Sequence, residues 1–177
     1  FPINIEIKAV KTYKAGTDEW LTYGLNSSMV LLPETPMKPR YADTRLGYFK
    51  NNIVDYDVSD RSAEITSMLA RWRLEPKPED IEKYKRGELV EPQKPIIIYI
   101  DPATPKKWVP YLIDGVNDWQ IAFEQAGFKN AIMAKEAPVN DSTWSLENAL
   151  NSAIVYKPSN IANASGPHVS DPRSGEI

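Results

Sequence analysis

The segment "KPIIIYIDP", residues 94–102, constrains the fold more than any other part of the sequence. It is a short, nearly continuous β-branched run with a proline near each end. Such a run predicts a strand buried on both faces, because a strand with one wet face would alternate apolar and polar residues. We therefore expect this strand to lie inside a sheet that is covered on both sides.

One long helix is predicted directly after this strand. Thr104 is a candidate N-cap and Pro105 suits a first helical position, while Pro110 sets the start of the main helix near residue 109. Apolar residues then recur in steps of three and four and form one stripe along the helix: Leu112, Val116, Trp119, Phe123 and Ala126. We expect this stripe to pack on the sheet, where four large side chains would contribute about 6–12 kcal/mol before entropy.

The end of the helix and the strands after it are also predicted. Gly127 supplies a left-handed terminus, with Phe128 packing back on Phe123. Further strands are expected over 129–137 and 152–158, separated by a loop or short helix that Trp144 anchors. A helix that crosses over between two strands of one sheet implies parallel pairing. Residues 91–177 are therefore expected to form an α/β unit.

Residues 1–90 are rich in strand signals and punctuated by proline, so we expect a β-rich segment that forms a separate layer or an arm on the sheet. Strands are predicted at 3–9 with one wet face, at 27–33, at 45–58 as one strand or a bent pair, and in the later half of 65–76. The polar stretch 78–89 holds at most two helical turns. The whole chain is thus expected to be α/β, or α+β.

Composition excludes several kinds of chemistry. The chain has no cysteine and one histidine, His168, so neither a thiol site nor a zinc site of converging histidines can form from it alone. His168 is read as a surface loop residue, with a ligand or substrate contact as the alternative. The net charge is −3 and the basic residues are scattered, so the sequence has no basic cluster of the kind that binds nucleic acid.

Two weaker patterns remain open. Asp55 and Asp57 would share a face of a strand and could form a glycosidase pair, although solvated acids at a strand end are the commoner reading. A set of aromatic residues could make a carbohydrate-stacking surface, although core packing is the commoner use of most of them. These aromatic residues are Trp20, Tyr23, Tyr41, Tyr48 and Phe49.

Several blocks of the sequence resemble zinc-dependent metalloproteases of the metzincin type from Bacteroidetes and related bacteria, which are secreted or surface-attached proteins. The resemblance covers nearly all of residues 33–177. The blocks that carry it are "PMKPRYADTRLGYF" (36–49), "RWRLEP" (71–76), "ELVEPQKPIIIYIDPATPKKWVPYLIDGVNDWQIAFEQAGFKNAI" (88–132) and "IANASGPHVSDPRSGEI" (161–177).

This resemblance implies a twisted mixed sheet with one long helix, as in the upper subdomain of a metzincin catalytic domain. In that family a helix carrying H-E-x-x-H follows the last block, and no such motif occurs in this chain. The resemblance therefore implies zinc in the full-length protein but no cofactor, metal ligand or catalytic residue in these 177 residues. The last block would lead into the edge strand of the substrate cleft, with Gly166 and Gly175 at tight turns. The cleft-edge residues implied are Gly166, Pro167, His168, Val169, Gly175, Glu176 and Ile177.

The resemblance also raises the question of latency. A cysteine switch cannot operate without cysteine, so Asp43 is the candidate carboxylate for that role. The plainer reading is an ion pair between Asp43 and Arg40 or Arg45 in a turn.

Together these features predict part of a secreted or cell-surface zinc metallopeptidase that is inactive by itself, with residues 1–90 as a prosegment or an extra layer. Its partners would be a peptide or protein substrate and the missing C-terminal half of the same chain. A sheet without its zinc helix would expose roughly several hundred square ångströms of apolar surface, so self-association or covering by the N-terminal residues is expected. The alternative is a non-catalytic extracellular module that binds a glycan or a protein.

Overall fold

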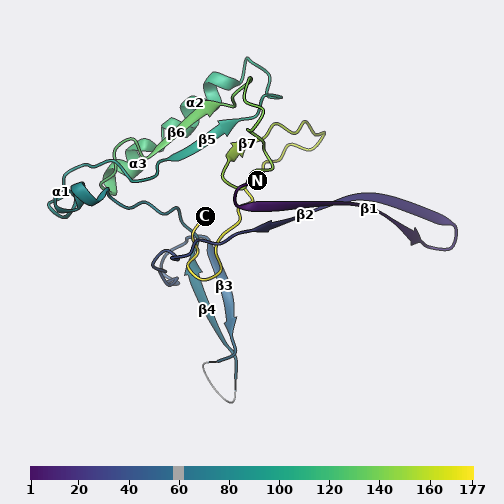
Figure 1. The fold of residues 1–177 in the computed structure, drawn as a ribbon, viewed down its shortest axis with the longest axis horizontal. Helices are drawn as coiled ribbons and strands as arrows, with labels where there is room; N and C mark the ends of the chain where they lie inside the picture. The colour runs from purple at the N-terminus through teal and green to yellow at the C-terminus, as the bar shows by residue number, and fades with distance from the viewer. Residues whose placement is uncertain (58–61) are drawn as a thin grey trace.

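The computed structural model describes residues 1–57 and 62–177 (Figure 1). It is a mixed α/β structure with three small, separate sheets. The elements in chain order are β1 (Asn4–Ala15), β2 (Glu19–Val30), β3 (Lys50–Asp55), β4 (Glu64–Leu69), the 3₁₀ turn η1 (Pro78–Asp80), α1 (Ile81–Lys85), β5 (Ile96–Ile100), α2 (Val109–Asn117), α3 (Gln120–Gln125), β6 (Ile132–Glu136) and β7 (Ser152–Ile154).

The second half of the chain forms a three-stranded sheet in the order β6-β5-β7. β5 pairs in parallel with β6, with Ile96 opposite Ile132, and in parallel with β7, with Ile98 opposite Ser152. The predicted strand, helix, strand order and its parallel crossover are confirmed. The sheet is parallel throughout rather than mixed.

The single long helix was predicted wrongly, because the structure breaks it into α2 and α3. The start at residue 109 is confirmed, but Thr104 is not the cap, because Trp108 occupies the N-cap position. Among the residues that the structure describes, no side chain forms a capping hydrogen bond to α2. At the break the Trp119 amide donates to the Val116 carbonyl, three residues back. A turn of this 3₁₀ type rotates the following residues around the helix relative to an α-helical turn.

The break changes which side chains face the sheet. Trp119, a predicted member of the apolar stripe, is 64% exposed. Gln120 is turned inward instead: its side-chain oxygen accepts from the Ala131 amide at 2.9 Å, and its nitrogen donates to the Phe128 carbonyl at 3.1 Å. An amide side chain thus ties α3 to the start of β6 where an apolar contact was predicted.

A small core lies where the chain turns from α3 into β6. Val90, Phe128 and Ala131 are buried, with Leu74, Tyr84 and Phe123 packed against them. Gly127 has φ +92°, which confirms the left-handed terminus, and the Phe128 amide donates to the Phe123 carbonyl at 2.9 Å. The predicted cap is therefore confirmed, and Phe123 packs against the core that contains Phe128. The helical turns predicted in 78–89 are also present, as η1 and α1.

β1 and β2 form an antiparallel hairpin, here called the arm (Asn4–Val30), which projects far from the rest of the molecule (Figure 1). Both strands are longer than the predicted 3–9 and 27–33, and they meet at a turn in which Gly16 has φ +72°. The turn contains Gly16, Thr17 and Asp18, and glycine and aspartate are residue types that favour turns.

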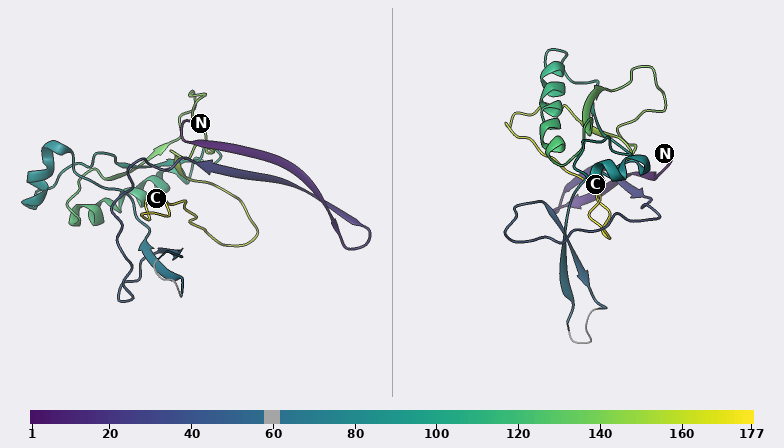
Figure 2. Two further views of the ribbon diagram at one scale, coloured as in Figure 1. Left: turned by 60° about the horizontal axis from the view of Figure 1, so that its bottom comes forward. Right: turned by 90° about the vertical axis from the view of Figure 1, so that its left-hand side faces the viewer.

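β3 and β4 form a second antiparallel hairpin, which Figure 2 shows pointing away from both the arm and the sheet. The strand predicted in 45–58 is confirmed as β3. For 65–76 the prediction was wrong in detail, since the earlier half forms β4 and the later half, with Trp72, is outside any strand. Arg71 there makes only an isolated bridge to Glu176.

Long-range hydrogen bonds hold the hairpins to the second half of the chain. The Asn4 side chain donates to the Glu147 carbonyl and accepts from the Ala149 amide. The Arg71 amide donates to the Gly175 carbonyl at 2.9 Å. Residues 1–77 are therefore held to the second half of the chain by hydrogen bonds to backbone groups, and not by side-chain packing alone.

Candidate functional site

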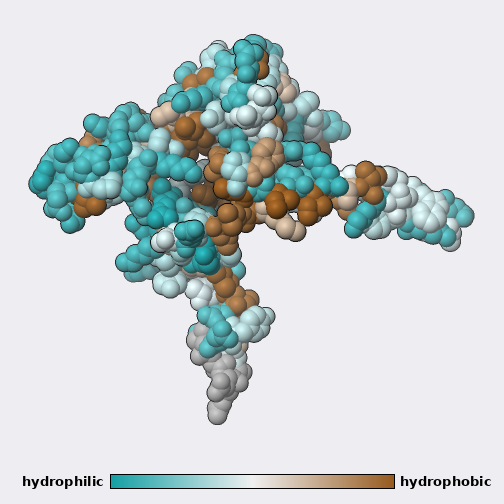
Figure 3. Space-filling view, in the orientation of Figure 1, coloured by the Kyte–Doolittle hydropathy of each residue, from teal (hydrophilic) through white to brown (hydrophobic). Residues whose placement is uncertain are grey.

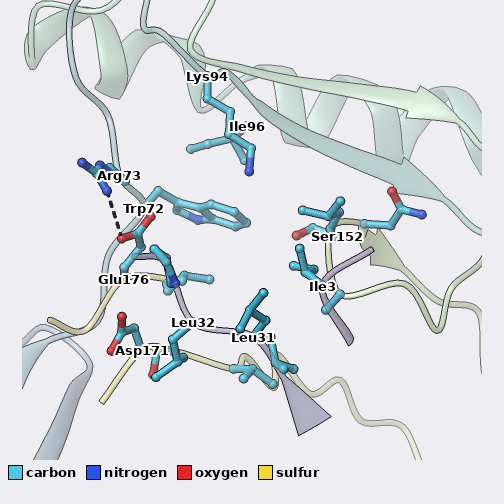
Figure 4. A pocket seen from close by; sticks show the side chains of 18 of the residues that line it. Ile3, Leu31, Leu32, Trp72, Arg73, Lys94, Ile96, Ser152, Asp171 and Glu176 are labelled. Carbon is cyan, nitrogen blue, oxygen red and sulfur yellow. Dashed lines mark ion pairs between the residues drawn. The ribbon is translucent and has the colours of Figure 1, made fainter. Parts of the chain in front are cut away.

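A cavity lies where the arm, the sheet and the C-terminal segment meet, and we call it the groove. It has a volume of about 620 Å³ and is partly open to solvent. Five segments form its walls (Figure 4). They are the base of the arm (Ile3 and Val30–Glu34), Trp72–Arg73, the start of the central strand (Lys94–Ile97 and Tyr99), the approach to β7 (Ala149–Ser152), and the chain end (Val169–Asp171 and Glu176–Ile177).

The interior of the groove is mostly apolar. The Trp72 ring extends into its middle, with Leu31 and Leu32 below it and Ile3 facing it from the far side (Figure 4). Ligand sites of this size are commonly apolar with a few polar groups at fixed places. The groove is therefore suited to an apolar occupant.

Lys94 lies on the central-strand wall of the groove, and the other charged side chains labelled in Figure 4 lie together on another side; they are Arg73, Asp171 and Glu176. The Arg73 guanidinium is 3.1 Å from a Glu75 oxygen and 3.7 Å from Glu176 Oε2 (Figure 4). Glu176 Oε2 is buried and has no hydrogen-bond partner among the described residues. Arg73 is thus shared between two carboxylates, and the longer of these contacts leaves Glu176 incompletely paired.

The tight turn Asp171–Gly175 supports this side of the groove. The Asp171 carboxylate accepts from the Arg173 amide at 2.8 Å and from the Arg173 guanidinium at 2.7 Å, while the Asp171 carbonyl accepts from the Gly175 amide at 2.8 Å. Arg173 also donates to the Pro33 carbonyl at 2.7 Å and so ties the turn to the base of the arm. The Asp171 side chain is only 2% exposed, and its hydrogen bonds from the Arg173 side chain hold the pKa of Asp171 below its ordinary value.

Because that pKa is lowered in the folded protein, Asp171 stabilises the fold above its unfolded-state pKa of about 3.9, and the contribution is lost as the pH falls through the folded value. We expect Asp171→Asn to cost about 1.5–3 kcal/mol of unfolding free energy at neutral pH, since it removes charged hydrogen bonds. Urea unfolding between neutral pH and about pH 2 should show a steeper acid loss for the wild type than for the variant.

Asp43→Asn is the matched control, because Asp43 makes the same contacts with Arg45 that Asp171 makes with Arg173. Asp43 lies in an open turn with its side chain 39% exposed. Its substitution should change the acid loss far less, since water screens and replaces exposed ion pairs. Equal effects of the two substitutions would contradict the role given to Asp171.

The predicted cleft-edge residues separate into two groups. Val169, Glu176 and Ile177 line the groove, and Gly175, with φ +74°, holds the turn beside it. The other three, Gly166, Pro167 and His168, are exposed and are not part of the groove lining. Residues 166–177 do not pair with the three-stranded sheet in the structure; they run back to Arg71 instead. Gly166 lies in a stretch without any turn and has no positive φ, so the tight turn expected there is wrong.

Sequence reasoning missed the groove residues from the N-terminal half, above all Ile3, Leu31, Leu32 and Trp72. Trp72 was read as part of an alternating strand, and the apolar residues at the arm base were read as ordinary strand positions. All four are large apolar residues, and only Leu31 and Leu32 directly precede a proline-rich connection, at 33–39.

Asp43 pairs with Arg45, as the plainer reading proposed, and hydrogen bonds from the Arg45 side chain hold the pKa of Asp43 below its usual range. Asp43 does not line the groove. Asp55 ends β3 and accepts a hydrogen bond from the Asp57 amide in the bend that follows, so the two do not share a strand face.

The predicted core packing of the aromatic set is wrong, because all five residues are exposed, from 49% for Tyr23 to 83% for Phe49. Within residues 1–57 and 62–177, no three His, Cys, Asp or Glu side chains converge as a metal site would require. No helix in these ranges is both long enough and apolar enough to cross a bilayer.

Comparison with known proteins gives one match. Residues 1–77 match a family model described as a domain of unknown function, DUF5117. No curated protein and no solved structure matches the chain. The matched residues comprise the arm, the β3–β4 hairpin and the Trp72–Arg73 wall of the groove, so the chain resembles DUF5117 over its two hairpins and not over its three-stranded sheet.

Proposed function

We propose that this chain is the sheet-bearing part of a secreted zinc-dependent metallopeptidase of the metzincin type, and that it supplies the scaffold and one wall of the cleft but not the metal site. The sequence resemblance over residues 33–177 motivates this proposal. The groove is the place where the next structural element of such a catalytic domain would pack.

The observation that carries the proposal is the mismatch between β5 and its surroundings. Its sequence, "IIIYI", is apolar on both faces, as suits a strand that is covered on both sides. Only Ile96 and Ile100 of β5 are buried in the structure, and the three residues between them are partly exposed. Ile97 and Tyr99, together with Ile96, line the groove. α2 and α3 cover one side of the sheet (Figure 2), so the other side favours a further apolar element.

The order of elements also supports the proposal. A strand, a crossover helix, a parallel strand and a third parallel strand occur in the order that the resemblance implies. Under this proposal Val169, Glu176 and Ile177 lie at the cleft edge, and the polypeptide is exported to the cell surface or beyond.

The residues described here do not fit a zinc site. His168 is exposed, and no set of three candidate ligands converges among residues 1–57 and 62–177. Zinc ligands and the water-activating glutamate would have to come from a segment that is not part of this sequence. No catalytic step is therefore assigned to any residue of this chain.

The proposal is tested first by the coding sequence beyond Ile177, and then by the effect of a substitution on the stability of a longer polypeptide. The coding sequence should continue into H-E-x-x-H, and the longer polypeptide should show chelator-sensitive peptidase activity that residues 1–177 lack. In the longer polypeptide Ile97→Ser should cost about 1–3 kcal/mol more unfolding free energy than in residues 1–177, because the added element buries that side chain. Denaturant unfolding of both lengths measures this difference.

Val139→Ser is the control, since Val139 is 87% exposed and is not part of the groove lining. It should be neutral in both lengths. A stop codon directly after Ile177, or a longer polypeptide in which Ile97→Ser costs no more than in the short one, would refute the proposal.

The exposed aromatic residues favour one second candidate, a non-catalytic extracellular module that binds a glycan or a protein. Tyr13 and Tyr23 lie side by side on the arm with ring centroids 6.2 Å apart. Exposed aromatic faces of this kind can stack on sugar rings or anchor a protein interface. Glycan-array binding by residues 1–177, together with no H-E-x-x-H downstream, would favour this candidate.

A further inference from the structure

The arm has two chemically different faces. Directly opposite residues of β1 and β2 share a face, and the side chains alternate along each strand. One face carries Glu6, Lys8 and Thr12 with their cross-strand partners, and we call it the polar face. The other face is mostly apolar, and we call it the apolar face. Its large side chains are Ile5, Ile7, Tyr13, Leu21, Tyr23, Leu25 and Met29.

The polar face is satisfied by contacts within the chain. Glu6 accepts hydrogen bonds from Asn26 and Ser28 across the strands, and the Thr12 and Thr22 hydroxyls lie 2.9 Å apart. At the arm base, Lys8 makes an ion pair with Glu147 of the loop before β7. The wet face predicted from the sequence is confirmed.

The apolar face is left uncovered by the described chain. Its seven large side chains are between 36% and 65% exposed, from Leu21 to Ile5. The apolar stripe begins at the groove, which Ile3 and Leu31 line, and runs outward along the arm. Figure 3 shows hydrophobic residues gathered where the arm leaves the body.

An uncovered face of this kind is unfavourable. A two-stranded hairpin is marginally stable by itself in water, and stable sheets need more strands or a packed face. The arm also extends beyond the rest of the molecule with no helix or strand beside its outer length, as Figure 1 and the left-hand view of Figure 2 show. Its twelve-residue strands therefore need a partner on the apolar face for the hairpin to stay folded.

We infer that the apolar face of the arm docks on the same face of a second copy of this chain, so that two arms pack face to face as a four-stranded antiparallel sandwich. About half of each of the seven side chains is exposed. At about 200 Å² for each large side chain, one arm offers roughly 700 Å² and two offer roughly 1,400 Å². That area lies within the range of about 1,200–2,000 Å² for stable interfaces.

The charge of the arm supports a homotypic contact. Residues 4–30 contain three lysines and three acidic residues, so the arm has no net charge and does not repel its own copy. An apolar face is also self-complementary, as a twofold interface requires. Lys11 is the one lysine on this face, and its long stem can keep the ammonium group in water. A neutral arm lacks the basic cluster that an anionic membrane or a nucleic acid would select.

The test is the oligomeric state of the whole 177-residue chain, measured by sedimentation across a wide concentration range. The wild type should dimerise, and Ile7→Lys on the apolar face should raise the dimer dissociation constant about tenfold or more. Val10→Lys is the matched control, because Val10 is a β-branched residue of β1 on the polar face and is 77% exposed. It should leave the dissociation constant within about twofold, because it removes little buried surface.

A second measurement does not depend on a disruptive substitution. The chain has no cysteine, so a single cysteine can be placed at Ala9, in the middle of the apolar face, or at Val10 on the polar face. Facing sheets lie about 10 Å apart, so a short thiol cross-linker should join copies with Ala9→Cys and not copies with Val10→Cys.

Three results would overturn the inference. The first is a monomeric wild type at every concentration. The second is an equal response to the two lysine substitutions. The third is a monomer that binds phosphatidylserine vesicles through the apolar face, with Ile7→Lys abolishing the binding, because a lipid surface would then be the occupant.

Discussion

Replacing Gly175 by alanine is expected to destabilise the protein by about 3 kcal/mol or more. Gly175 has φ +74°, a conformation that costs an L-residue about 1–2 kcal/mol. A Cβ there would also overlap the Leu69 carbonyl oxygen and lie 3.0 Å from its carbonyl carbon. Neither atom can move aside easily, because both belong to the backbone at the end of β4.

Gly175→Ala should also change the structure of the groove. The Gly175 carbonyl accepts from the Arg71 amide and the Ile177 amide donates to the Arg71 carbonyl, so displacing Gly175 separates the chain end from the Trp72 wall. Denaturant unfolding measures the stability, and Trp72 fluorescence in a background without the other tryptophans reports the groove. We expect both to change together.

Substitutions at two other glycines separate the cost of the positive φ from the cost of the clash with Leu69. Gly16 has φ +72° but nothing within 4 Å of an added Cβ in the described structure, so Gly16→Ala should show the backbone cost alone, about 1–2 kcal/mol. Gly47 has the same open space and no positive φ, so Gly47→Ala should be nearly neutral. If Gly175→Ala cost no more than Gly16→Ala, the close approach to Leu69 would be disproved.

The second large effect is expected for Phe128→Ala, at about 3–5 kcal/mol. Phe128 is 4% exposed, stacks on Tyr84 at 4.9 Å between ring centroids, and packs with Val90 and Ala131 in the small core. That core joins α1, α3 and β6. Removing the ring leaves a cavity that these short elements cannot refill without moving apart.

Trp119→Ala is the matched control for Phe128→Ala. Both residues are large and aromatic and lie near α3, but Trp119 is 64% exposed. Its removal should change the unfolding free energy by less than about 0.5 kcal/mol. Urea unfolding of both variants decides the matter, and a loss at Trp119 as large as at Phe128 would contradict the placement of these side chains.

Local signals in the sequence determined the second half of the fold. The run "IIIYI" became β5, Pro110 marked the start of α2, and Gly127 ended α3. These predictions succeeded because each depends on the conformational preferences of a few neighbouring residues. The parallel pairing of β5 with β6 followed from the length of the helical connection between them.

Which surfaces are covered was decided only by the tertiary structure. Periodicity marked Trp119 as buried, but one 3₁₀ turn and the hydrogen bonds of Gln120 turned it outward. Trp72 faces a groove because Arg173, far along the chain, binds the carbonyl of Pro33 and brings the chain end to the arm base. An apolar pattern in the sequence indicates that a face is more stable when buried. Whether the face is covered depends on segments far away in the sequence, and the exposed apolar face of the arm is an example.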